Sequence, residues 1–241
     1  MRDSVEDSIV LFERAGRLLM TIDKEYQKSV DTGTVSSELR IAIRDYLGDI
    51  RSTLDYLAWD IFTDKCMANI DAEKLNATMT RIQFPILDEK KEFDKRIRNN
   101  FKGLSSEIVD VLESVQSYKT ADDTCWIKLL QELNNENKHR NLTRQKKRTK
   151  QQINNLQIAQ EGVNFTFVGC TSNLEDIEFM KMLTGSSITD KELRTHPDVA
   201  EYDVDMEVKL LFKELDAPVL DTLQKIHRGA SELTQKILSV I

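Results

Sequence analysis

The sequence of 241 residues has little of what usually interrupts or cross-links a fold: three prolines, eight glycines and three cysteines. So few prolines and glycines, beside many charged residues, are typical of long helices joined by short connections. Cys66, Cys125 and Cys170 are an odd number at wide spacings without a C-x-x-C pair, which argues against a secreted disulfide framework and against a zinc ribbon. We therefore expect a cytoplasmic protein.

Several signals of membrane, nucleotide or metal binding are also lacking. No run is apolar enough to cross a membrane, and the charged residues 1–7 do not resemble a signal peptide. The sequence has no G-x-x-x-x-G-K, G-x-G-x-x-G or H-E-x-x-H motif, so we expect no cofactor and no metal. The net charge of −7 argues against general adsorption to nucleic acid, because proteins that grip phosphates non-specifically are usually basic. Any contact with RNA must be local.

Apolar residues recur at three- and four-residue steps, the pattern of amphipathic helices. We predict helices over residues 5–29, 90–101, 105–118 and 218–240. Two further helices are predicted to begin at a cap on Ser36 or Ser37 and near residue 122. The second helix has the clearest stripe, formed by Ile43, Leu47, Ile50, Leu54, Leu57 and Ile61. We expect residues 76–87 to be irregular and to plug the bundle, since Phe84 precedes Pro85 and is pushed out of helical geometry.

Beyond this the period changes to two, as in Val163, Phe165 and Phe167, and a clearer strand with a polar face follows over 202–212. A short helix is predicted over 175–183. We thus predict a mainly α-helical, α+β protein of one domain. Its parts are a helical bundle over 1–150, a small antiparallel sheet over 151–215, and a C-terminal helix over 216–241 that packs back on the bundle.

The helix that begins near residue 122 turns polar at its end, reading Asn134-Asn135-Glu136-Asn137-Lys138-His139-Arg140. If the helix continues, Asn135 and His139 share a face. A basic segment follows at once, with Arg144, Lys146, Lys147, Arg148 and Lys150. One interpretation is a local phosphate site. The other is a frayed helix end followed by a solvated loop.

A second polar set lies on the second helix, where Arg51 and Asp55 are four residues apart, opposite the apolar stripe. They form either a simple intrahelical ion pair or one wall of the site around His139. The other two histidines have simpler interpretations. We expect His196 in a loop, and His227 solvated or facing a helix dipole.

Together, Arg51-Ser52-Thr53-Leu54-Asp55-Tyr56-Leu57-Ala58, Phe84-Pro85-Ile86 and the motif ending in Lys138-His139-Arg140 resemble a group of uncharacterised bacterial proteins. More distantly, the stretch 36–148 resembles the HEPN superfamily. That resemblance implies a helical bundle, a homodimer, and a metal-independent ribonuclease of a toxin or phage-defence system. HEPN ribonucleases carry an arginine shortly before the histidine, where this chain has Asn134 and Asn135, so only His139 matches directly.

The first functional hypothesis is therefore a metal-independent endoribonuclease. His139 would be the acid and base, Arg140 would stabilise the phosphate charge with Lys138 or Arg51, and Asn135 would complete the cluster. Its partners would be RNA, a second copy of the chain, and an antitoxin or defence-system subunit. The alternative is a non-catalytic module that binds RNA, a nucleotide or a protein through the basic segment 138–150. A third hypothesis has the strand 202–212 recruit a partner by strand addition.

Overall fold

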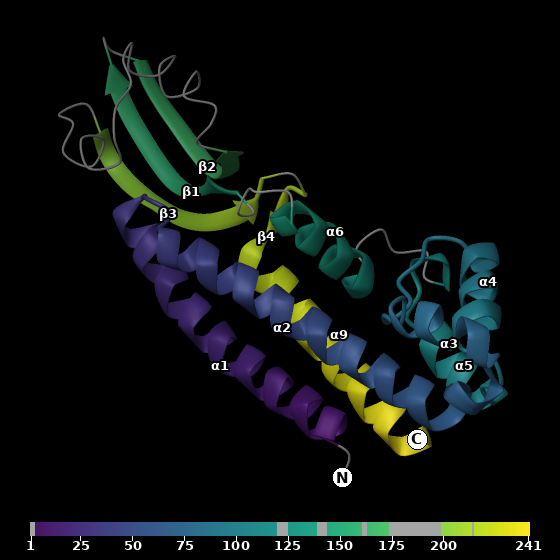
Figure 1. Ribbon diagram of the computed structural model, residues 1–241. Coiled ribbons are helices and arrows are strands. Elements are labelled where there is room, and N and C mark those ends of the chain that lie inside the picture. Colours follow the sequence, from purple (N-terminus) through teal and green to yellow (C-terminus); the bar gives the residue numbers. More distant parts are fainter. Residues whose placement is uncertain (1–2, 120–124, 139–143, 161–162, 174–198, 214) are drawn as a thin grey trace. The chain divides into compact units, whose positions relative to one another are not determined.

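The computed structural model describes residues 3–119, 125–138, 144–160, 163–173, 199–213 and 215–241. Side chains are described for 4–119, 125–136, 144–148, 209–213 and 215–241. The chain forms two compact units, each treated separately below (Figure 1). A helical unit comprises Met1–Ser29, Thr34–Arg144 and Leu220–Ile241, and a sheet unit comprises Val30–Gly33 and Gln145–Val219.

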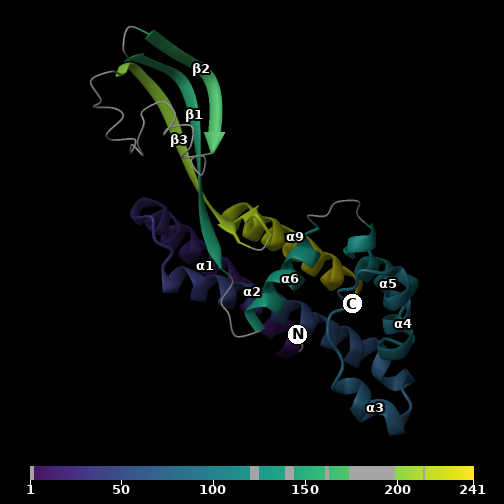
Figure 2. The same cartoon turned by 90° about the horizontal axis from the view of Figure 1, so that it is seen from above.

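Three long helices build the helical unit: α1 (Asp3–Thr32), α2 (Ser37–Ile61) and α9 (Val219–Val240). They lie side by side in Figures 1 and 2. Ser36 caps α2 as expected, since its hydroxyl accepts a hydrogen bond of 3.0 Å from the Leu39 amide. All six residues of the predicted α2 stripe are fully buried, so that helix and its buried face are confirmed.

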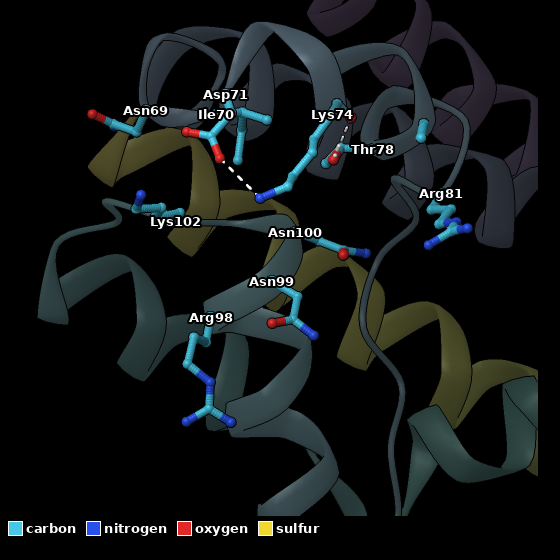
Figure 3. Close-up of a pocket in the computed structure, with 11 residues that line it drawn as sticks. Asn69, Ile70, Asp71, Lys74, Thr78, Arg81, Arg98, Asn99, Asn100 and Lys102 are labelled. Atoms are coloured by element: carbon cyan, nitrogen blue, oxygen red, sulfur yellow. Dashed lines mark hydrogen bonds and ion pairs between the residues drawn. The ribbon is translucent and has the colours of Figure 1, made fainter.

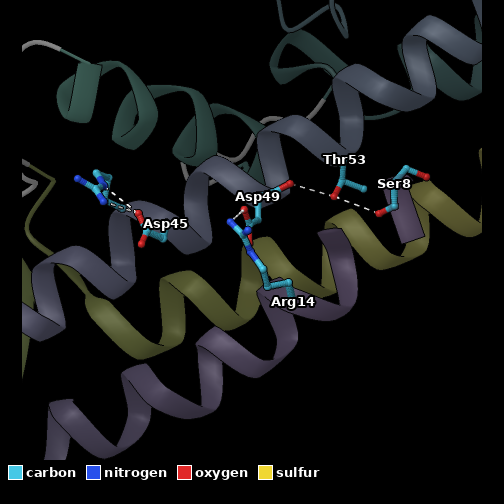
Figure 4. A network of polar contacts seen from close by, with 6 residues as sticks. Ser8, Arg14, Asp45, Asp49 and Thr53 are labelled. Carbon is cyan, nitrogen blue, oxygen red and sulfur yellow. Dashed lines mark hydrogen bonds and ion pairs between the residues drawn. The ribbon is translucent and has the colours of Figure 1, made fainter. Parts of the chain in front are cut away.

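Polar contacts fix the neighbours of α2. Arg14 of α1 donates to both carboxylate oxygens of Asp49, at 2.6 and 2.5 Å, and the Thr53 hydroxyl lies 3.4 Å from the Ser8 carbonyl oxygen (Figure 4). Asp49 is 4% exposed. Arg14 supplies the opposite charge that the buried Asp49 carboxylate needs, because an unpaired buried charge is costly.

Shorter helices continue from α2. They are η1 (Phe62–Cys66), η2 (Met67–Asn69), α3 (Ala72–Met79), α4 (Lys90–Asn100), α5 (Ser106–Glu113), η3 (Ser117–Lys119) and α6 (Trp126–Lys138). In Figures 1 and 2, α3, α4 and α5 gather near the C-terminal end of α2. The prediction that residues 76–87 are irregular is only partly right, because α3 reaches Met79.

The sheet unit contains β1 (Gln145–Gln160), β2 (Val163–Asn173), β3 (Val199–Phe212) and β4 (Ala217–Pro218), in the order β2-β1-β3-β4. Every pair is antiparallel, and β1 pairs along most of its length with both β2 and β3. The sheet begins at Gln145, so the sequence-based boundary at residue 150 falls inside β1. The helix predicted over 175–183 lies outside the described residues.

The chain is thus mainly α-helical with a small antiparallel sheet inserted before the last helix, and the predicted fold class is confirmed. The helix predicted over 218–240 is α9, whose Leu223, Ile226, Leu233 and Ile237 are buried as expected. Within the described part of the chain, none of the helices combines the length and apolar character that a membrane crossing requires.

Candidate functional site

The pair Arg51 and Asp55 holds the backbone of Phe84. One carboxylate oxygen of Asp55 accepts a hydrogen bond of 2.8 Å from the Phe84 amide, and the Arg51 guanidinium donates to the Phe84 carbonyl at 3.1 Å. The same guanidinium lies 2.9 Å from Asp55. Because a buried amide and carbonyl need partners, the two side chains act on Phe84 much as a neighbouring strand would. The pair is therefore more than a simple intrahelical ion pair.

Gln116 supplies hydrogen-bond partners to the backbone of the residues that follow Phe84. Its side-chain amide donates to the Pro85 carbonyl at 2.9 Å, and its oxygen accepts from the Leu87 amide at 2.9 Å. Gln116 is fully buried, and the Phe84 ring is 1% exposed. The prediction that Phe84 lies outside a helix and is buried in the bundle is confirmed, and Arg51, Asp55 and Gln116 supply hydrogen bonds to its segment.

Helix α6 brings the polar motif to this place. Asn134, 8% exposed, donates to the Leu47 carbonyl of α2 at 3.1 Å. Near the first turn of α6, the Trp126 ring covers Gly229 of α9, where a Cβ atom would lie 2.5 Å from three ring atoms. These two contacts fix α6 against α2 and α9, so Asn135 is held over α2.

A cavity of about 200 Å³, the Arg51 pocket, results from this packing. It is lined by Arg51, Gln83, Phe84, Ile86, Leu87, Arg96, Gln131, Asn134 and Asn135. Two arginines and several amide side chains face it, and none of these lining residues is acidic. Guanidinium and amide N–H groups are donors that suit an oxyanion such as phosphate. Two candidates from distant parts of the sequence, Arg51 and Asn135, thus line one cavity.

The sequence did not indicate Arg96 as part of this site. It lies on α4 in the run Lys95-Arg96-Ile97-Arg98, where the charged residues read as an ordinary solvated face. Arg96 lines the Arg51 pocket beside residues 83–87, a neighbourhood that arises only when the chain is folded. The sequence offers one signal near this helix end: the amide pair Asn99 and Asn100, which follows the basic residues directly.

The remaining predicted catalytic residues are described less fully. His139 and Arg140 lie outside the described residues, and Lys138 is the last residue of α6, without a described side chain. Among the described residues, no group of three or more His, Cys, Asp or Glu side chains is placed to hold a metal ion.

The basic segment is not a solvated loop, because Lys146, Lys147 and Arg148 belong to β1. Lys146 and Arg148 both pair with Asp216, at 2.8 and 2.7 Å, while Arg144 just before the strand is exposed. These hydrogen bonds hold the pKa of Asp216 below its usual range. Two of the four predicted phosphate-binding cations are therefore engaged by a carboxylate of the same sheet unit.

Of the other histidines, His196 lies outside the described residues. The expectation for His227 is wrong, since it lies within α9 and stacks on Phe12 of α1 with ring centroids 4.6 Å apart. Burial lowers its pKa. His227 lies beside Ile226, a buried residue of the α9 stripe, and its ring therefore reaches α1. The apolar pattern alone did not show that this neighbouring position is also covered.

Comparison of the chain with models of known protein families, with curated proteins and with solved structures gives no match.

Proposed function

We propose that the protein is an RNA-binding, metal-independent endoribonuclease of the HEPN-like kind. The observation that supports this most is the meeting of Arg51 and Asn135 in one cavity. HEPN ribonucleases carry their arginine on the same helix as the histidine. Here Arg51, reaching in from α2, would supply the positive charge that Asn134 and Asn135 lack.

The reaction requires few groups. The ribose 2′-oxygen attacks the adjacent phosphorus, so a 2′-O–P bond forms and the P–O5′ bond breaks. His139, which follows Lys138 in the sequence, takes the 2′ proton and returns one to the leaving 5′-oxygen. Arg51, with Arg140 or Lys138, stabilises the charge on the equatorial oxygens, and Asn135 donates a hydrogen bond to the phosphate. The products are a 2′,3′-cyclic phosphate and a 5′-hydroxyl.

Asp55 has a positioning role in this proposal. It fixes the Arg51 guanidinium, and the Phe84 carbonyl takes a further donor of the same group. A guanidinium held in one geometry loses less side-chain entropy when it binds phosphate. The proposal also includes the homodimer and the antitoxin or defence-system partner implied by the resemblance.

The test is cleavage of a mixed RNA by the purified protein in EDTA, with product ends analysed for cyclic phosphate. We expect His139→Ala to abolish cleavage and Arg51→Lys to lower it by about 10²–10³-fold, the usual effect of losing one oxyanion donor. Arg44→Gln is the matched control, because Arg44 lies two turns earlier on α2 and pairs with Asp45 at 2.7 Å. Equal cleavage by the wild type and His139→Ala would refute the proposal.

The non-catalytic module is the second candidate, and one observation favours it: Arg51 already has a structural task at Phe84. In that case, the wild type and His139→Ala would both be inactive and both would still bind RNA. With Lys146 and Arg148 paired to Asp216, binding through the basic segment would then depend on Arg144 and Lys147, and their replacement by glutamine would abolish it.

A further inference from the structure

A larger hollow on the helical unit carries a charge opposite to that of the protein. One cavity of about 420 Å³ lies between the η2–α3 segment and the end of α4 (Figure 3). A second, also of about 420 Å³, shares Arg81 and Asn100 with the first. It shares Gln83 and Arg96 with the Arg51 pocket. The three cavities therefore adjoin one another through shared side chains, and together they are called the groove below.

The groove is strongly basic although the chain carries a net charge of −7. Its lining holds one acidic residue, Asp71, and the cations Arg51, Lys74, Arg81, Arg96, Arg98 and Lys102. Asp71 pairs with Lys74 at 3.0 Å, which also lowers the pKa of Asp71. Among the described residues, no carboxylate pairs with Arg81, Arg96 or Arg98. Like charges gathered without counter-charges repel one another, so a stable arrangement favours an anionic ligand.

The wall of the groove is also preformed. Gly103 adopts a φ of +95°, a conformation that favours glycine, and approaches the Asn69 amide so closely that a Cβ atom could not fit. The Asn69 amide in turn donates to the Lys65 carbonyl at 3.1 Å. The loop after α4 is thus seated against η2.

We infer that this groove binds the phosphate backbone of a single-stranded RNA and leads it to the Arg51 pocket. The identity of the polyanion rests on the proposed function. A concave surface favours a single strand, because protein elements must project into the grooves of a duplex. The lining contains cations and amides but only one aromatic side chain, Phe84, whose ring is buried. Without stacking, binding is sequence-tolerant and driven by counterion release.

The test measures binding by fluorescence anisotropy to a labelled, single-stranded 2′-O-methyl RNA of roughly 12 nucleotides, within the usual site sizes. Its blocked 2′-oxygen prevents cleavage, so the result does not depend on catalysis. With Arg81, Arg96, Arg98 and Lys102 each meeting a phosphate, log K should fall with log salt at a slope of about −2.8. The double variant Arg81→Gln/Arg98→Gln should bring the slope to about −1.4 and weaken binding by roughly 25-fold at about 0.1 M salt.

The control is Lys91→Gln/Lys95→Gln, which removes the same charge from α4 outside the groove and should leave the slope unchanged. Equal weakening by both double variants would overturn the inference, as would wild-type protein that does not bind the oligonucleotide. Equal competition by a duplex of the same sequence would overturn the single-strand assignment, and equal competition by a polyglutamate peptide would indicate an acidic protein ligand instead. Equal cleavage or equal inactivity of the wild type and His139→Ala, with this binding intact, would count against the ribonuclease proposal and leave the groove assignment standing.

Discussion

Two helical glycines in different surroundings should respond to alanine with opposite signs. At Gly48 of α2, a Cβ atom would have nothing within 4 Å. Alanine is favoured over glycine inside a helix by about 1 kcal/mol, so Gly48→Ala should stabilise the protein by about 0.5–1 kcal/mol. At this chain length, that corresponds to a rise in Tm of about 1–4 °C.

At Gly229 of α9, alanine would bring the same gain in helix propensity but would also clash with Trp126. A Cβ atom there would lie 2.5 Å from Cγ, Cδ1 and Cδ2 of Trp126. Since Cγ is the ring atom bonded to the Trp126 Cβ, rotation about the Cβ–Cγ bond cannot relieve the contact. Either the Trp126 side chain changes its χ1 rotamer or the start of α6 moves. Overpacking of this kind costs about 1–3 kcal/mol. We therefore expect a net loss of about 1 kcal/mol for Gly229→Ala.

Thermal unfolding followed by circular dichroism would measure both variants. A double-mutant cycle isolates the contact: in a Trp126→Leu background, Gly229→Ala should become stabilising, as at Gly48. If the Arg51 pocket binds RNA as proposed, Gly229→Ala should also weaken that binding, because α6 carries Asn134 and Asn135, while Gly48→Ala should not. A Gly229→Ala variant that is as stabilised as Gly48→Ala would refute the assigned packing of Trp126.

Two further predictions concern buried polar groups. Gln116→Leu would leave the Pro85 carbonyl and the Leu87 amide without the partner that Gln116 supplies. The free energy of unfolding, measured in urea, should therefore fall by about 2–4 kcal/mol. A change below about 0.5 kcal/mol would contradict the assigned hydrogen bonds. The pKa of His227 is lowered from its ordinary value of 6.5, so below that value the unfolded chain takes up a proton that the folded chain does not. Stability measured from about pH 7.5 to about pH 5.5 should therefore fall, and His227→Phe should reduce this slope; an unchanged slope would exclude His227 as its source.

The helices were predictable where a single face is buried. The α2 stripe, the Ser36 cap and the extended Phe84-Pro85 step each follow from local rules, since periodicity, a side-chain acceptor and the ring of proline act within a few residues. These elements carry most of the helical unit. They needed no information from distant parts of the chain.

The basic start of strand β1, before the predicted sheet boundary at residue 151, could not be predicted in the same way. The sequence of β1, Gln145–Gln160, is rich in glutamine, asparagine and lysine and shows little alternation, so neither pattern nor propensity favours a strand. It becomes a strand because β2 and β3 pair with it on its two sides. That hydrogen-bonding environment is supplied by residues that come later in the sequence. It gives paired backbone where one of the two interpretations of the basic segment had a solvated loop.

The contacts of Arg51 also depend on residues distant in the sequence. Its structural role at Phe84 and its proposed role in binding phosphate can be separated by one substitution. The stripe of Arg51 and Asp55 was visible in the sequence, which left open whether the two residues form a simple ion pair or one wall of a site around His139. Their described partner is the Phe84 backbone. An Asp55→Asn variant keeps an oxygen for the Phe84 amide and removes the charge that fixes Arg51. If the stripe is only a clamp, Asp55→Asn and the wild type should bind RNA alike. If Arg51 also meets phosphate, losing its carboxylate partner frees its charge while loosening its geometry, so affinity should rise while cleavage falls.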